Sequence, residues 1–153
     1  MAQPQTALIV DDNQELADSL ALALRRAGFV ARTAHNGLHG YSCYFRDPTD
    51  WVVTDVDMPE LNGIDMMRSI RTINSSVKTI YMTGLVEKHR RSLAQESRAF
   101  GARVLLKPFT LHQLIEQMRG ADHKPPSEVS VLSKDLHNCT ELPAVNTAGV
   151  AKK

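Results

Sequence analysis

The stretch WVVTDVDMPELNG (residues 51–63) decides the fold of this chain. It opens with an apolar, β-branched run that is typical of a buried strand. The run ends on a carboxylate, Asp55, and continues into a loop that contains Pro59 and Gly63. A charge at the end of a buried strand is costly unless a metal ion or hydrogen bonds support it, and ligands bind at this edge of open α/β sheets. Asp55 is therefore the first candidate functional residue.

Length and composition indicate one globular domain with a packed core. The chain has 153 residues, of which 42% are hydrophobic and 23% are charged, and its formal net charge is +1. This balance gives no reason to expect binding to nucleic acid or to an anionic membrane. Residues 1–6 lack the features of a signal peptide, and no apolar run approaches the roughly 20 residues of a membrane span. Cys43 and Cys139 form no metal-binding pattern, which favours free thiols in a reducing cytosol.

Strand and helix patterns alternate along most of the chain. Strands are expected at residues 6–10, 29–34, 51–55, 77–82 and 103–106. Helices are expected between Asn13 and Gly28, at about 38–45, 63–72 and 87–100, and after Thr110, which can cap the last one. Five β-α units predict a parallel sheet with helices on both faces and right-handed crossovers. Residues 122–153 have no aromatic residue and little apolar periodicity, so we expect a flexible tail or a short helix there.

Polar residues follow four of the expected strands. They are Asp11 and Asp12, Asp55, Thr83 and Lys107. In a parallel sheet these strand ends share one edge, so the sequence predicts three carboxylates, a hydroxyl and an ammonium around one pocket. Clustered carboxylates repel each other, and a hard divalent cation such as Mg²⁺ removes that repulsion. A carboxylate can itself be the nucleophile in phosphoryl transfer, with a lysine to meet a phosphoryl oxygen.

Further motifs follow the third and fifth strands, namely Met58-Pro59 with Gly63, and Lys107-Pro108-Phe109. Together with the polar residues above, they resemble the receiver domain of bacterial response regulators. The order and spacing match along most of the chain. The resemblance implies a CheY-like, flavodoxin-like (βα)5 fold, doubly wound, with strand order 2-1-3-4-5, over residues 1–121. It also implies two-component signalling, in which a histidine kinase or a phosphotransfer protein supplies a phosphoryl group.

The resemblance assigns the acidic residues to phosphoryl and metal chemistry. Asp55 corresponds to the phosphoacceptor. Asp12 corresponds to a direct Mg²⁺ ligand, Asp11 to a ligand that acts through water, and Asp57 to a residue whose backbone carbonyl binds the metal.

The resemblance assigns three more residues to the phosphoryl group and its surroundings. Thr83 corresponds to the switch hydroxyl, and Lys107 to the lysine that pairs with phosphoryl oxygens. The peptide bond before Pro108 is expected to be cis.

Two positions depart from the family pattern. Val104 stands where many receivers have Tyr or Phe, which puts the aromatic switch of those proteins in question but not the phosphorylation chemistry. Asp57 adds a carboxylate two residues after the acceptor, and we hypothesise that its side chain tunes metal affinity or the lifetime of the phosphoryl group.

The leading interpretation is a cytoplasmic, single-domain response regulator that is not a turnover enzyme. We expect it to signal by protein binding through its fourth helix, fifth strand and fifth helix, with a homodimer as a further possibility and without direct DNA or membrane binding. The basic residues of the fourth helix, Lys88, Arg90 and Arg91, are interpreted as a solvated face.

Two other functions remain open at this stage. One is a binding module of the same fold that is never phosphorylated. The other is a haloacid-dehalogenase-like phosphatase, because Asp55 and Asp57 also match the Asp-x-Asp of those enzymes, in which the second Asp is the acid/base. The acidic pair of such enzymes comes last in the chain, whereas Asp11 and Asp12 come first here.

Overall fold

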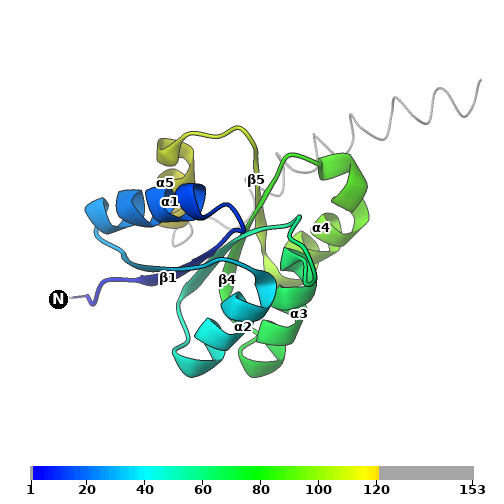
Figure 1. Ribbon diagram of the computed structural model, residues 1–153, viewed down its shortest axis with the longest axis horizontal. Helices are drawn as coiled ribbons and strands as arrows, with labels where there is room; N and C mark the ends of the chain where they lie inside the picture. Colours follow the sequence, from blue (N-terminus) through cyan, green and yellow to red (C-terminus); the bar gives the residue numbers. More distant parts are fainter. Residues whose placement is uncertain (1, 121–153) are drawn as a thin grey trace, which may run out of the picture.

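The computed structural model describes residues 2–120. They form one parallel sheet in the order β2-β1-β3-β4-β5, with five helices around it (Figure 1). In chain order the elements are β1 (Thr6–Val10), α1 (Gln14–Arg26), β2 (Val30–Ala34), α2 (Gly37–Arg46), β3 (Trp51–Asp55), α3 (Gly63–Ile73), β4 (Lys78–Thr83), α4 (Val86–Phe100), β5 (Arg103–Leu106) and α5 (Leu111–Arg119). The predicted flavodoxin-like fold and strand order are confirmed. The domain boundary predicted after residue 121 and the tail predicted for residues 122–153 lie outside the described residues.

The sheet separates two apolar layers. Because successive side chains of a strand point to opposite faces, Leu8 and Val10 join the core beneath α2 and α3, while Ala7 and Ile9 join the core beneath α1 and α5. Figure 1 shows α1 and α5 on one side of the sheet and α2 and α3 on the other. β3 is buried along its whole length, as expected of the central strand of a doubly wound sheet. No helix within residues 2–120 is both long and apolar enough to cross a membrane.

Short polar side chains fix where most helices begin. Asn13, Asn36, Asn62 and Thr110 each accept a hydrogen bond from a backbone N–H in the first turn of the helix that follows. Helix α4 differs, because it begins after Leu85 and has no side-chain cap. The expected helix bounds at 38–45, 63–72 and 87–100 differ from the observed ones by single residues at the ends.

The helical pattern of residues 87–100 predicts that Phe100 faces the core, and this prediction is wrong. Its side chain is 45% exposed, and a buried guanidinium, that of Arg71, lies 4.1 Å from the centroid of its ring. The inner face of α4 instead carries Glu96, which forms an ion pair with Arg71 and accepts a 2.7 Å hydrogen bond from the hydroxyl of Tyr81. A second guanidinium nitrogen of Arg71 donates to Thr79 at 3.0 Å. This charged network joins α3, β4 and α4, and burial is tolerated because each charge has a partner.

A glycine brings the start of α3 against the end of β3. A Cβ atom on Gly63 would lie 2.1 Å from the carbonyl oxygen of Asp55 and 3.0 Å from the hydroxyl of Thr54. The N–H of Gly63 also donates to the carbonyl of Val56 at 3.0 Å. The loop after β3 therefore closes tightly only because residue 63 has no side chain, and this closure positions Asp55.

We expect Gly63→Ala to lower the free energy of unfolding by at least about 2 kcal/mol, because its methyl group must displace the backbone of Asp55. Urea unfolding followed by circular dichroism measures this change. Gly84→Ala is the matched control, since its Cβ would meet only the Cβ of Lys107 at 3.9 Å. Equal stability of the two variants would contradict the close approach.

Candidate functional site

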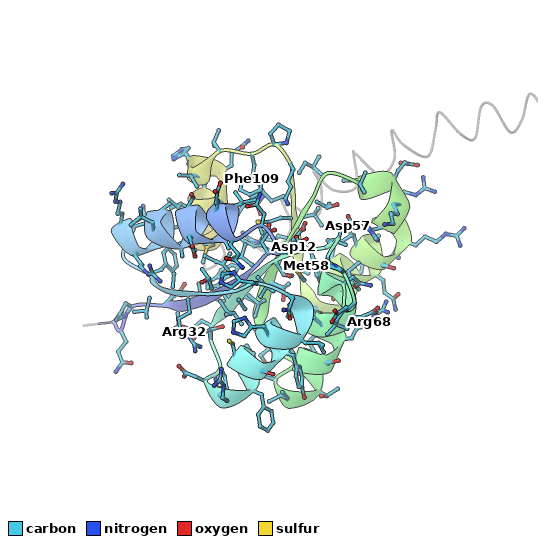
Figure 2. All side chains as sticks on the ribbon, viewed as in Figure 1. Asp12, Arg32, Asp57, Met58, Arg68 and Phe109 are labelled. Atoms are coloured by element: carbon cyan, nitrogen blue, oxygen red, sulfur yellow. The ribbon has the colours of Figure 1, made fainter. Side chains whose placement is uncertain are left out.

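The site lies where the strands end. Asp55 and Thr83 are the last residues of β3 and β4, while Asp11 and Lys107 directly follow β1 and β5. The parallel register pairs Asp55 with Met82 and Thr83 with Leu106, so these ends lie at one edge of the sheet. Figure 2 shows Asp12 and Asp57 at this edge, with Asp57 toward α4.

Three carboxylates meet at this edge. Asp11, Asp12 and Asp55 each offer an oxygen, and these oxygens all lie within 4.8 Å of one another. Asp11 and Asp55 are buried, whereas Asp12 is exposed. Asp11 is further held by a 2.9 Å hydrogen bond from the N–H of Asn13. The grouping predicted from the strand ends is therefore present in the structure.

Lys107 supplies the positive charge of the site. Its Nζ lies 3.2 Å from Oδ1 of Asp55 and 3.4 Å from Oδ2 of Asp11. Its backbone N–H donates to the carbonyl of Thr83 at 2.9 Å, and the peptide bond between Lys107 and Pro108 is cis. The lysine therefore spans two of the three carboxylates.

Burial and mutual repulsion shift the ionisation of these groups. Burial, followed by the charge of Asp11, raises the pKa of Asp55 to about 6, although Lys107 opposes the shift. Burial also raises the pKa of Asp11. Burial lowers the pKa of Lys107, but the nearby Asp55 and Asp11 outweigh it and leave that pKa above its usual value. The single ammonium thus compensates the buried acids only in part.

Thr83 is fully buried, and its hydroxyl lies on the last residue of β4. The hydroxyl oxygen accepts a 2.9 Å hydrogen bond from the N–H of Leu85, just before α4 begins. Val104 lies on β5 opposite Tyr81 of β4 and is half-buried. At this level of the sheet the buried aromatic side chain is therefore that of Tyr81 on β4, and β5 has Val104.

The response regulator receiver domain model matches residues 7–119. The chain belongs to this receiver domain family. The match spans every described strand and helix except the first residue of β1.

The relatives of this receiver domain include a transcriptional regulatory protein and a response regulator receiver protein. The transcriptional regulatory protein CusR of Escherichia coli K12 is 32% identical over 112 residues, which are 73% of this chain and 48% of CusR. The response regulator receiver protein CpdR of Brucella abortus is 29% identical over 111 residues, which are 72% of this chain and 91% of CpdR. The chain thus spans about half the length of CusR and most of CpdR.

Two crystal structures share the fold. The chemotaxis protein CheY4 of Vibrio cholerae has a TM-score of 0.67 at 24% identity, covering 76% of this chain and 97% of CheY4. The response regulator TrrA of Thermotoga maritima, solved with Mg²⁺ and BeF, has a TM-score of 0.65 at 27% identity, covering 75% of this chain and 96% of TrrA.

The acidic residues of this receiver domain fit a divalent cation. The cluster presents carboxylate oxygens from Asp11, Asp12 and Asp55 within one small volume, and hard cations such as Mg²⁺ take oxygen ligands. Burial raises the pKa of Asp11 and of Asp55, and Lys107 supplies too little positive charge to offset it. A cation bound there would supply that charge, so the cluster is consistent with a receiver-domain metal site.

The side chain of Asp57 points away from this cluster. Its Oδ1 lies 2.9 Å from Nζ of Lys88 and 2.8 Å from Nε2 of His89, both on α4. Burial pushes the pKa of Asp57 upward, but the hydrogen bonds from Lys88 and His89 outweigh it and leave the pKa below its usual value. The carboxylate is thus occupied by α4, unlike the acid/base that a haloacid-dehalogenase-like phosphatase requires beside Asp55.

The contact of Asp57 with α4 was not predicted from the sequence. Lys88 was interpreted as part of a solvated face, and His89 had no assigned function. Neither residue carries a local signal, because their partner Asp57 is 31 and 32 residues away along the chain. Only the packing of the loop after β3 against α4 joins them.

We expect Asp55→Asn to stabilise the cation-free protein by about 1–2 kcal/mol at pH 8. The pKa of Asp55 is about 6 in the folded chain, above its ordinary value of 3.8. The folded protein therefore binds the proton of Asp55 more tightly than the unfolded chain does. Stability is lost as the pH rises through the range between the two pKa values. The gain of the variant is expected to vanish at about pH 4, where the folded wild type is protonated at Asp55.

Urea unfolding in the presence of EDTA, at several pH values, measures this difference. Asp65→Asn is the control, because Asp65 is a half-exposed acid on α3 that forms an ion pair with Arg68. If wild type and Asp55→Asn are equally stable at pH 8, the carboxylate is not destabilised by burial.

Proposed function

We propose that Asp55 accepts a phosphoryl group from a histidine kinase or a phosphotransfer protein, and that the phosphorylated domain signals by binding a protein partner. The observation that carries this proposal is the position of Asp55, a buried carboxylate beside two other acids and 3.2 Å from the ammonium of Lys107. Membership of the receiver domain family supports it. The domain would act as a regulator that is modified once per signal rather than as a turnover enzyme.

The chemistry of acceptance follows from the groups around Asp55. An oxygen of the ionised carboxylate attacks phosphorus, the bond from phosphorus to the donor nitrogen of a phosphohistidine breaks, and the donor ring takes a proton. Lys107 already lies within reach of Asp55, so its ammonium is placed to stabilise negative charge on the phosphoryl oxygens. The hydroxyl of Thr83, at the end of the neighbouring strand, is placed to donate a hydrogen bond to one of them.

A magnesium ion is part of this proposal. Asp11, Asp12 and Asp55 would hold it, together with the backbone carbonyl of Asp57. When bound, the ion supplies positive charge that neutralises the acids and the incoming phosphoryl oxygens. Burial and the charge of Asp11 otherwise leave the pKa of Asp55 at about 6, so part of the acceptor is protonated near neutral pH.

The surface formed by α4, β5 and α5 is the proposed partner-binding face. A groove of about 620 Å³ runs along β5 and α5, and it is lined by Val104, Ile115 and several polar side chains of α5. Leu106 and Leu111 border this region and are 38% and 45% exposed. Exposed apolar side chains beside polar ones suit a protein partner, and the net charge of +1 gives no support to DNA as the ligand.

We expect one phosphoryl group on the wild-type protein after incubation with Mg²⁺ and acetyl phosphate, and none on Asp55→Asn, because that variant lacks the nucleophile. Intact mass spectrometry measures the adduct. Asp50→Asn is a matched control, since Asp50 is an exposed acid that binds Thr6 at the opposite end of the sheet. Equal labelling of Asp55→Asn and the wild type would refute the assignment of Asp55.

We expect Lys107→Met to slow acceptance by roughly 100-fold, as removal of one preorganised charge donor does at other sites of this kind. The rate of appearance of the phosphorylated mass measures the loss. Arg91→Met, which removes an exposed cation of α4, should leave the rate within about twofold. An unchanged rate in Lys107→Met would show that the ammonium does not stabilise the transferring group.

A further inference from the structure

The first turn of α4 is held from outside the helix. The other four described helices each have an N-cap side chain, whereas α4 has none. The unpaired N–H groups at a helix start carry positive character, and a carboxylate near them is favourable. Near this start lie two residues of the candidate site. The hydroxyl of Thr83 accepts from the N–H of Leu85 at 2.9 Å, and the carboxylate of Asp57 contacts Lys88 and His89.

One oxygen of Asp57 binds both α4 side chains. Its Oδ1 receives Nζ of Lys88 at 2.9 Å and Nε2 of His89 at 2.8 Å. A carboxylate oxygen only accepts, so Nε2 of His89 is the donor. The side chains of Asp57 and His89 are 29% and 16% exposed. This contact is therefore more sheltered than an ordinary surface ion pair, which salt and side-chain entropy weaken. We call these three residues the loop–α4 clasp.

The clasp begins in the loop that directly follows Asp55. Asp57 is two residues after Asp55, in a loop that the N–H of Val56 joins to the carbonyl of Met82 and the N–H of Gly63 closes onto the carbonyl of Val56. The carbonyl of Asp57 is the one that the proposed function assigns to the cation, while its side chain contacts Lys88 and His89 of α4. A change in the loop at this residue is transmitted directly to Lys88 and His89.

The other end of α4 is held by different contacts. Glu96 binds Arg71 of α3 and the hydroxyl of Tyr81 of β4, and all three side chains are buried. These contacts do not involve the loop after β3. The last turns of α4 are therefore anchored to the core, and the clasp acts on the first turn.

We propose that the loop–α4 clasp couples cation occupancy of the acidic site to the order of the first turn of α4. A cation on the acids and on the carbonyl of Asp57 restrains the backbone of that residue, and its carboxylate then holds Lys88 and His89 more firmly. Coupling of this kind is reciprocal, so an ordered first turn also favours the cation. The inference rests on the magnesium site of the proposed function and adds a route from that site to α4.

The test is hydrogen exchange of residues 90–93, whose amides donate to carbonyls of the first turn in an α-helix. In the wild type, Mg²⁺ is expected to slow their exchange by about 1.5- to fivefold, the range that ion pairs of this kind support. In Asp57→Asn, exchange should be faster and should no longer respond to Mg²⁺. A variant with both Lys88→Met and His89→Leu should behave as Asp57→Asn does.

Two controls separate the clasp from general effects of charge. Glu87→Gln removes another acid of the same turn, one that forms an ion pair with Arg90, and should retain the Mg²⁺ response. Calorimetry should show that Asp57→Asn still binds Mg²⁺, because its backbone carbonyl and the three clustered acids remain.

The outcomes distinguish the two proposals. If the wild type binds Mg²⁺ and residues 90–93 exchange at the same rate with and without it, the coupling is wrong and the magnesium site stands. An equal Mg²⁺ response in Asp57→Asn also overturns the coupling. If calorimetry detects no Mg²⁺ binding by the wild type, the magnesium site and the inference both fail.

Discussion

The burial of two neighbouring acids at one edge of the sheet is the constraint on which the rest of the site depends. Asp11 and Asp55 are both buried, and the pKa of each is raised, Asp55 to about 6. Lys107 lies within 3.4 Å of both but supplies only one positive charge. A protein keeps such an arrangement at a cost in stability. The same unmet charge makes this edge suited to a divalent cation with oxygen ligands.

The fold supplies the stability and the precision that this site needs. β3 is buried between two apolar layers, so the position of Asp55 is set by strand pairing on both sides. Gly63 allows α3 to begin against the backbone of Asp55, which closes the loop after β3. The burial that raises the pKa of Asp55 is thus a consequence of the same packing that places its carboxylate beside Lys107.

Helix α4 is the element that connects this edge with the remainder of the domain. Its last turns are attached to the core by the pair of Glu96 with Arg71, a buried contact in which each charge needs its partner. Its first turn is attached to the loop after β3 by the partly exposed contact of Asp57 with Lys88 and His89. Partly exposed ion pairs are weaker than buried networks. One end of the helix is therefore held by a buried ion pair, and the other by a partly exposed contact with the loop after β3.

The sequence by itself determined the elements and the acidic cluster of this receiver domain. Alternating β-type and helical patterns, with Asn13, Asn36, Asn62 and Thr110 at helix starts, act within a few residues, so they could be recognised locally. The acids at the strand ends could be grouped as well, because parallel topology brings those ends to one edge.

Only the tertiary structure decided which charged residues of α3 and α4 are buried and where the carboxylate of Asp57 points. Phe100 was predicted to face the core and no burial was predicted for Arg71 and Glu96, yet the ion pair lies inside and the ring is 45% exposed. The two partners of each contact are 25 to 32 residues apart in the sequence. This holds for Arg71 with Glu96 and for Asp57 with Lys88 and His89. A helical or strand period predicts which face a residue occupies, but it does not predict which distant charged residue it will contact. That contact depends on how the helices pack.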